Sequence, residues 1–527
     1  MSRSATPQSP VSRSLPRLSR ATLAGLAGSS HDAGAPVSSD SLGAPGLQIG
    51  ASAPAQTGIV HIGLAQFHRA HAAVATAQAL AVEPGPWGIL GVASHSPRIA
   101  NALAEQDYLY SVLQLTPEGE EVGVVDVHRG TLVAAQDPAG VVAAIADPAH
   151  KIVTLTVSEN GYRKDPERVG LDLTDAATLA DLVNPAAPTT TIGLITRGLE
   201  RRFADGGAPI TILSCDNMQS AGTLTRALVI EFLTRAGADP AVLEWLEKSV
   251  TFPNSMVDRI VPATTDATRE HVAELAGCWD EVPVPAEAFT MWVIEDKFAA
   301  GRPAWECADG VVFSDEVEKY EQVKLRLLNG SHSLISYLGA LDGRETIPAS
   351  RTQGFVEACV RRAITEEFLP SIDLPSGFDP DAYVDQLFVR WTNFALGDLV
   401  ARVGSDGSAK ILQRVPVPAL RLLRMGKMPQ QMALLVAAWI ACVCPPAGFV
   451  PGPIADAMVE PKRGFLAQAT SGAASPAEHA RAVMTSGMFP QELAEREDFT
   501  ERVGELLGLI VERGVLAASS SALEAGL

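Results

Sequence analysis

The stretch TGIVHIGLAQF, residues 57–67, decides the fold that the sequence predicts. Its apolar run ends at Gly63, and an alanine-rich helix is expected over residues 67–80. A strand, a glycine turn and a helix open a dinucleotide-binding fold, in which the helix N-terminus faces a pyrophosphate. The fingerprint is degraded, because Gly63-x-Ala65-x-Phe67 keeps only its first glycine. On this segment alone, an ordinary strand-to-helix turn fits at least as well.

Further cofactor-binding residues are expected around this turn and at the ends of later strands. Arg69 lies near the start of the expected helix, where it could reach a phosphate. More strands are expected over residues 87–93, 151–158 and 209–213. Because ligands gather at the carboxyl ends of strands in an open sheet, the turn containing Glu159 and Gly161 is a candidate for function. Asn217 is a candidate for the same reason.

The turn after the second expected strand, Ser94-His95-Ser96-Pro97-Arg98, bears on the choice of cofactor. In this fold an acidic residue normally holds the ribose hydroxyls at that position. No acidic residue stands there, and either His95 or Arg98 could accept a 2′-phosphate. The sequence therefore leaves NAD and NADP open.

Beyond Asp315 the pattern changes to long apolar stretches at helical spacing. Helices are expected over residues 317–338, 350–368, 380–399, 418–425, 430–443, 476–486 and 491–514. The predicted fold is thus α/β, with a Rossmann-type domain over residues 57–312 and a mostly α-helical domain over residues 313–527. Residues 1–56 are expected to form a partly disordered tail. A short helix over residues 17–26 of that tail would be capped by Ser19.

Composition and cysteine spacing limit the kinds of molecule that the protein is expected to bind and the compartment in which it is expected to work. The chain has 61 acidic and 41 basic residues and a formal charge of −20, which argues against nucleic acid as a partner. Its six cysteines are scattered, without a C-x2-C pair or a zinc-binding set, so we expect no metal and a reduced, cytoplasmic compartment. No uninterrupted run of about 18 apolar residues predicts a membrane span.

The best indication of chemistry is KLRLLNGSH, residues 324–332. At about 100° per residue, Asn329 and His332 lie about 140° and 80° around a helix from Lys324, so the three groups can converge. A lysine buried on an apolar helix has a lowered pKa and can accept a proton from an alcohol, while an asparagine stabilises the oxygen. The alternative is a solvated lysine, an asparagine cap before Gly330 and a core histidine.

Six ordered blocks of sequence resemble one family. They are residues 63–71, 214–217, 252–259, 292–296, 301–306 and 324–333. Together they resemble the polyol-specific long-chain dehydrogenases, a family that includes mannitol 2-dehydrogenase, fructuronate reductase and arabinitol dehydrogenase. Six blocks in order are far more specific than any single motif.

The resemblance implies zinc-independent hydride transfer with NAD, at an active site between the two domains. It implies that Lys324 is the general base, that Asn217 and Asn329 hold the reacting oxygen, and that His332 orients the substrate. Three further residues are implied less specifically and could be solvated surface groups: Arg402 and Lys410 as contacts to the polyol, and Glu321 as a proton relay.

The expected substrate is a polyol and ketose pair such as mannitol and fructose, with NAD as cofactor and NADP not excluded. Recognition of a uronate substrate would require an additional cation near its carboxylate. Fructuronate reductase and arabinitol dehydrogenase activities therefore remain alternatives, as do a sugar-binding module without nucleotide binding and a zinc alcohol dehydrogenase. The expected partner is a small molecule, and the expected state is a monomer or small homo-oligomer.

Overall fold

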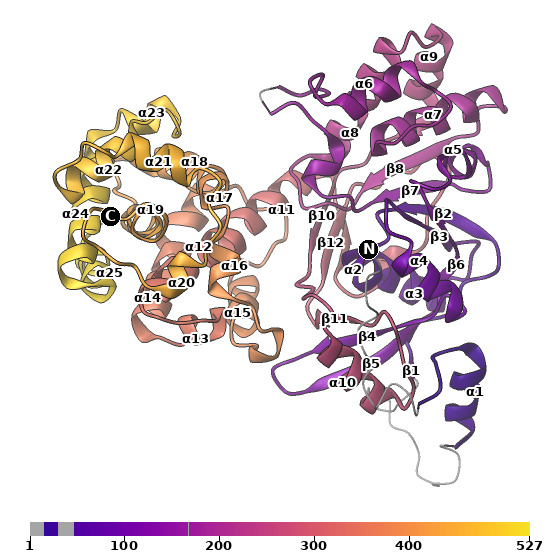
Figure 1. Ribbon diagram of the computed structural model, residues 1–527, viewed down its shortest axis with the longest axis horizontal. Coiled ribbons are helices and arrows are strands. Elements are labelled where there is room, and N and C mark those ends of the chain that lie inside the picture. The colour runs from indigo at the N-terminus through magenta and orange to yellow at the C-terminus, as the bar shows by residue number, and fades with distance from the viewer. Residues whose placement is uncertain (1–14, 30–46, 167, 527) are drawn as a thin grey trace, which may run out of the picture. The chain divides into compact units, whose positions relative to one another are not determined.

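The chain divides into two compact units, residues Met1–Glu318 and Lys319–Leu527. The computed structural model describes residues 15–29, 47–166 and 168–526. The disorder predicted for the early part of the tail falls outside these ranges. Figure 1 shows a sheet flanked by helices in the first unit and a set of helices in the second.

The first unit is built on a six-stranded parallel sheet. Its strands, in spatial order, are β6 (His128–Val133), β3 (Gly88–Ala93), β2 (Thr57–Ile62), β7 (Ile152–Leu155), β8 (Ile210–Ser214) and β9 (Val250–Thr251). Numbered along the chain, this order is 3-2-1-4-5-6, and every neighbouring pair is parallel. That is the Rossmann order, and its topological switch point lies between β2 and β7. The α/β prediction is confirmed.

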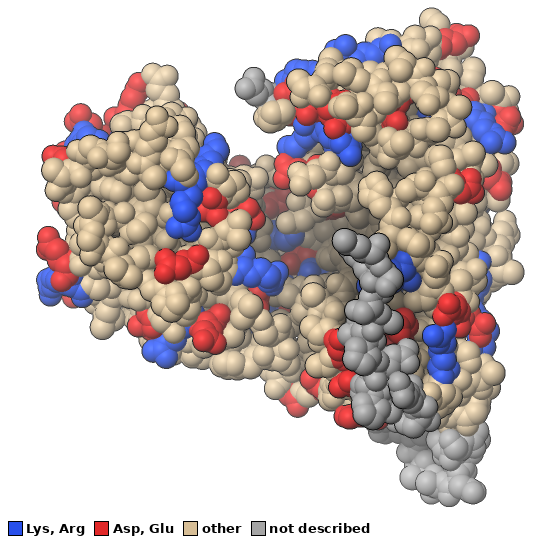
Figure 2. All heavy atoms as spheres, in the orientation of Figure 1, with Lys and Arg blue, Asp and Glu red and all other residues tan. Residues whose placement is uncertain are grey.

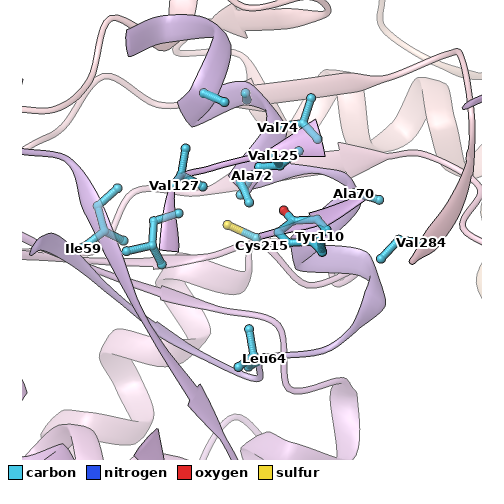
Figure 3. Close-up of a cluster of buried hydrophobic side chains, with 14 of the residues drawn as sticks. Ile59, Leu64, Ala70, Ala72, Val74, Tyr110, Val125, Val127, Cys215 and Val284 are labelled. Carbon is cyan, nitrogen blue, oxygen red and sulfur yellow. The ribbon is translucent and has the colours of Figure 1, made fainter. Parts of the chain in front are cut away.

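Alternating side chains of these strands build two hydrophobic clusters, one on each face. Ile59 and Leu213 pack with α3 (Ala72–Val82) in one cluster, part of which Figure 3 shows around Tyr110 and Cys215. Val60 and Ile212 pack in the other cluster. That second cluster contains residues of α5 (Pro138–Ala146), α7 (Thr191–Ala204) and α8 (Ala221–Arg235). Burial on both faces explains why the inner strands β2, β3, β7 and β8 are mostly apolar.

The helix predicted over residues 67–80 is two helices, α2 (Gln66–Ala70) and α3. The break falls at His71, whose φ of −122° and ψ of −93° leave the helical region. The His71 ring stacks on Phe67 with ring centroids 5.0 Å apart and meets the edge of Trp292 at 5.4 Å. These ring contacts fix a chain direction that helical periodicity does not predict.

The sequence did not predict two smaller sheets. One has the order β1 (Leu47–Gln48), β5 (Glu120–Val125), β4 (Tyr110–Leu115) and β11 (Val284–Glu287), and the other has the order β10 (Ser255–Asp258), β12 (Met291–Ile294) and β13 (Val311–Phe313). The helix predicted in the tail forms as α1 (Arg20–Ser29). Ser19 caps it by accepting a hydrogen bond from the amide of Thr22 at 3.1 Å.

The second unit is mostly helical, as predicted. Its main helices are α12 (Ser331–Leu341), α13 (Ile347–Arg351), α14 (Gly354–Arg362), η6 (Ala363–Phe368), α15 (Pro380–Arg390), α16 (Val400–Gly404), α17 (Gly407–Arg414), α18 (Pro416–Arg424), α19 (Gln430–Val443), α22 (Pro476–Met484), α24 (Glu497–Arg513) and α25 (Val515–Glu524). Every residue of α19 is buried, and α12, α24 and α25 pack around it. Within the described ranges, no helix has the length and apolar character needed to cross a membrane.

Three predicted helices have the wrong extent. The helix expected over residues 380–399 ends at Arg390, and the Asn393 side chain then accepts a hydrogen bond from the amide of Ala395 in a new turn. The helix expected over residues 350–368 is divided among α13, α14 and η6. The one expected over residues 491–514 breaks before α24. These helices end although the apolar periodicity continues.

Candidate functional site

The predicted glycine turn lies at the switch point of the sheet. Gly63 follows β2 with a φ of +106°, and a Cβ there would lie 2.1 Å from the carbonyl oxygen of Thr156, which follows β7. The Thr156 hydroxyl donates to the Gly63 carbonyl at 3.0 Å. The backbones at the two strand ends therefore approach so closely that only glycine fits. This close approach fits the dinucleotide site that the fold places at a switch point.

The other residues of the first turn have distinct surroundings. Ala65 is exposed at the N-cap of α2, and Phe67 is half-buried against His71. Arg69 is buried, and its guanidinium donates to the carbonyls of Val282 and Ala65. These hydrogen bonds connect α2 with the loop before β11. A contact between Arg69 and a phosphate stays a prediction.

The loop after β7 carries Glu159 and Gly161. Glu159 is exposed and pairs with Lys164 at 2.8 Å, on the edge of a hollow of about 420 Å³. A Cβ at Gly161 would lie 2.8 Å from the Cβ of Val157, so the loop packs tightly on itself. Both residues lie at the carboxyl end of a sheet strand, where a cofactor is expected.

Asp216, which sequence reasoning did not select, holds this loop in place. Its buried carboxylate accepts hydrogen bonds from the amides of Val157 and Ser158 at 3.1 and 2.8 Å, and from the Tyr162 hydroxyl at 2.8 Å. Burial raises the pKa of Asp216, and these three donors oppose that shift. Asn217 is the next residue and is exposed. Asp216 thereby links the ends of β7 and β8 next to Asn217, whose side-chain amide is predicted to bind the reacting oxygen.

The predicted catalytic lysine lies in the second unit, on a helix that is not regular. Residues Lys324–Gly330 form a π-helix, η5, between α11 (Val317–Val323) and α12. A π-turn has more residues than an α-turn, so the predicted angles of about 140° and 80° are wrong. Such π-turns inside α-helices occur frequently at functional sites.

Burial excludes one of the two interpretations of this motif. Lys324 is only 8% exposed, and Glu321, one turn earlier, is 6% exposed, so a solvated surface lysine is excluded. Asn329 is not a helix cap, because the helix continues to Leu341. Asn329 and His332 are half-buried, and the His332 ring centroid lies 5.7 Å from that of Trp391. A buried lysine thus shares one helix with two half-buried polar residues.

Arg402 and Lys410 lie on neighbouring short helices, α16 and α17. Arg402 is exposed and forms an ion pair with the buried carboxylate of Asp398. Lys410 is half-buried and donates to the carbonyl of Val403 at 3.0 Å. Burial, followed by the nearby charge of Arg414, lowers the pKa of Lys410 to about 8. Within the described residues, no three His, Cys, Asp or Glu side chains are grouped as metal ligands.

Comparison with known families accounts for both units. Residues 57–307 match the model of the mannitol dehydrogenase Rossmann domain, and residues 316–506 match that of the mannitol dehydrogenase C-terminal domain. The chain belongs to the mannitol dehydrogenase family.

Several family members are similar over most of their length. The D-mannonate oxidoreductase of Escherichia coli is 34% identical over 86% of this chain and 93% of that protein. The mannitol 2-dehydrogenase of Cereibacter sphaeroides is 39% identical over 72% of this chain and 80% of that protein. The solved ternary complex of Pseudomonas fluorescens mannitol 2-dehydrogenase with NAD and D-mannitol has a TM-score of 0.79 at 30% identity, over 96% of this chain and 99% of that one.

Some sequence blocks shared with the mannitol dehydrogenase family have structural roles in this chain. The Asn254 side chain accepts a hydrogen bond from the backbone amide of Thr223 in the first turn of α8, and the backbone amide of Asn254 donates to the Glu295 carboxylate at 2.8 Å. Arg302 pairs with Asp296 and Glu306. The contacts of Asn254 join segments 31 and 41 residues apart, whereas those of Arg302 are local, and both sets of contacts stabilise the first unit.

We expect Gly63→Ala to weaken NADH binding by about tenfold or more. The added methyl group would meet the Thr156 carbonyl at 2.1 Å, so the ends of β2 and β7 must separate. Gly206→Ala is the matched control, because Gly206 also has a positive φ, of +118°, but open space where its Cβ would lie. Fluorescence titration with NADH measures both variants. Equal affinities would show that the close approach at Gly63 does not shape the nucleotide site.

Proposed function

We propose that this member of the mannitol dehydrogenase family oxidises a polyol to its ketose with NAD⁺ and catalyses the reverse reduction with NADH. Mannitol and fructose are the first pair to test. The observation that carries the proposal is the buried Lys324 on a π-interrupted helix that also carries Asn329 and His332. Membership of the family and a Rossmann sheet with a glycine-only switch point support it.

Each catalytic residue has a proposed role in moving the hydroxyl proton. Lys324 in its neutral form accepts that proton, and Glu321 relays it to water. Asn217 and Asn329 donate hydrogen bonds to the developing alkoxide, in the manner of an oxyanion hole, and His332 orients the substrate. NAD⁺, when bound, accepts the hydride.

The proposed cofactor site is the carboxyl edge of β2 and β7. Gly63, Ala65 and Phe67 form its first turn, with Arg69 behind them, and Glu159 and Gly161 form its second. NAD is the proposed cofactor. NADP is not excluded, because His95 and Arg98 are both exposed in the turn after β3 and could hold a 2′-phosphate.

A uronate substrate is the second candidate, favoured by the similarity to the D-mannonate oxidoreductase of Escherichia coli. The cations of α16 and α17 favour a polyol instead. Arg402 is already paired with Asp398, and Lys410 donates to the carbonyl of Val403, so both cations already have partners within the chain. We propose that both contact the hydroxyls of a polyol. On the face that Figure 2 shows, the described Lys and Arg side chains lie among Asp and Glu.

A spectrophotometric panel of polyols, ketoses and uronates with NAD(H) and NADP(H) tests this proposal. We expect the highest kcat/KM with a polyol and ketose pair and NAD(H). A preference for fructuronate or mannonate would support the second candidate. Absence of saturable NADH binding would indicate a sugar-binding module, and stoichiometric zinc in metal analysis would indicate a zinc enzyme. The oligomeric state, a monomer or small homo-oligomer, and the cytoplasmic location both stay predictions.

A further inference from the structure

We propose that Arg414 is a positioning residue for the proposed reaction, because it fixes the π-turn that carries Asn329 and His332. This inference rests on the proposed function of that helix. Arg414 lies at the end of α17 and belongs to none of the predicted catalytic or substrate-binding residues.

The contacts of Arg414 are made at the end of the π-helix. Its Nη1 donates to the backbone carbonyl of Asn329 at 2.8 Å and also to the hydroxyl of Ser333, which is fully buried. A π-turn disturbs the regular pattern of helical hydrogen bonds, so a donor from outside the helix can select one local conformation. His332 lies between the two acceptor residues in the sequence and is held in the same turn.

A second arginine makes the reciprocal contact. Arg326, inside η5, donates to the carbonyl of Gln413, the residue before Arg414. The two helices are therefore joined by two arginine-to-carbonyl bonds that run in opposite directions. On the other side of the turn, a Cβ at Gly330 would lie 2.8 Å from the ring of Phe368, which is itself buried. The π-turn is thus held between α17 and η6.

The charge of Arg414 argues for more than a packing role. Burial lowers its pKa to about 10, yet it stays a cation at neutral pH. Within the part of the chain that the structure describes, Arg414 and Arg326 have carbonyls and a hydroxyl as partners, and no carboxylate acts on the pKa of either. A buried cation without a counter-charge is costly, and a neutral donor would serve a structural bond equally well.

The same charge acts on Lys410, one turn earlier on α17. Burial is the main cause of the lowered pKa of Lys410, and the charges of Arg414 and Arg402 lower it further, while Asp406 and Asp398 raise it. Removing the charge at position 414 should therefore raise the pKa of Lys410. Arg414 thus connects the catalytic helix with the proposed substrate contact.

The test compares Arg414→Met with the parent enzyme, after the parent has shown activity in the substrate panel. Arg421→Met is the matched control, because Arg421 is an exposed arginine of the same unit, on α18. We expect Arg414→Met to lower kcat about tenfold or more without changing the affinity for NADH. We also expect its pH profile of kcat/KM to move to higher pH. Arg414→Lys should recover only part of kcat, because an ammonium lacks the planar fork of a guanidinium.

Ser333→Ala keeps the inference testable if Arg414→Met does not fold. This change removes one acceptor and leaves the cation in place, so we expect a several-fold loss of kcat at an unchanged melting temperature. The inference is overturned if folded Arg414→Met, or Ser333→Ala in its place, matches the parent in kcat and pH profile. It is also overturned if activity falls only in proportion to the folded fraction. A parent that is inactive on the whole panel would instead refute the proposed function.

Discussion

Lys324→Ala is expected to lower kcat for polyol oxidation by about 100-fold or more while leaving NADH binding intact. Alanine cannot accept the hydroxyl proton, and removing a group that stabilises charge at the reacting oxygen typically has an effect of this size. Lys324 is buried, so solvent water cannot readily take its place. Steady-state kinetics with the best polyol of the panel, together with fluorescence titration of NADH, measures the two quantities separately.

Two further variants sharpen this experiment. Lys462→Ala removes an exposed lysine from the same unit and should leave kcat unchanged. Lys324→Arg keeps a cation at the site but supplies no base, because a guanidinium does not lose its proton in proteins. Lys324→Arg should therefore be nearly as inactive as Lys324→Ala. If a folded Lys324→Ala enzyme oxidised polyols at the parental rate, the proposed mechanism would be wrong.

The sequence predicted the four inner strands of the central sheet, β3, β2, β7 and β8, because they are short apolar runs that end in turns, but it did not predict the edge strands β6 and β9. It did not predict the smaller sheets, since β10, β12 and β13 are too short to show a period and depend on distant partners. Val284 in β11, for example, pairs with Val112 in β4. Such pairings depend on tertiary packing, which local patterns do not report.

The limits of prediction at the site have a similar origin. The residues of the Lys324 motif were found from their spacing, but the π-turn was not, because local spacing does not report its contacts with Arg414 and Phe368 on other helices. Asp216 and Arg414 were both missed. Each is a buried charge whose partners include backbone groups distant in the sequence. A charged residue within an otherwise apolar run was the only available signal.

Three buried histidines lead to the last prediction, a loss of stability in mild acid. His61 on β2, His68 on α2 and His128 on β6 are each at most 1% exposed. The rings of His61 and His68 stack with centroids 3.3 Å apart, and Nε2 of His68 lies 3.1 Å from Nε2 of His128. Burial lowers the pKa of His61 and of His128 to about 3 and holds that of His68 well below its usual value.

The direction of the effect follows from these pKa values. At a pH well above about 6.5, both the folded and the unfolded chain hold the three imidazoles neutral, and stability is at its full value. Between pH 6.5 and about 3 the unfolded chain takes up protons that the folded chain cannot, so stability falls as the pH falls. In this range each histidine lowers the free energy of unfolding by about 1.4 kcal/mol for each pH unit, so the three together lower it by about 4 kcal/mol per pH unit. Against a typical total of about 5–15 kcal/mol, this loss is large.

We therefore expect the stability of the first unit to fall steeply below about pH 6.5, and NADH binding to be lost over the pH range in which this unit unfolds. The two losses should coincide because Nε2 of His61 contacts the Thr156 hydroxyl at 3.0 Å, and that hydroxyl donates to the carbonyl of Gly63. Denaturant titrations at a series of pH values measure the slope. His128→Gln should reduce it by about 1.4 kcal/mol per pH unit, whereas His95→Gln, at an exposed position, should not. A stability that stays constant from pH 7 to pH 5 would mean that the folded protein accommodates a charged imidazole at this cluster.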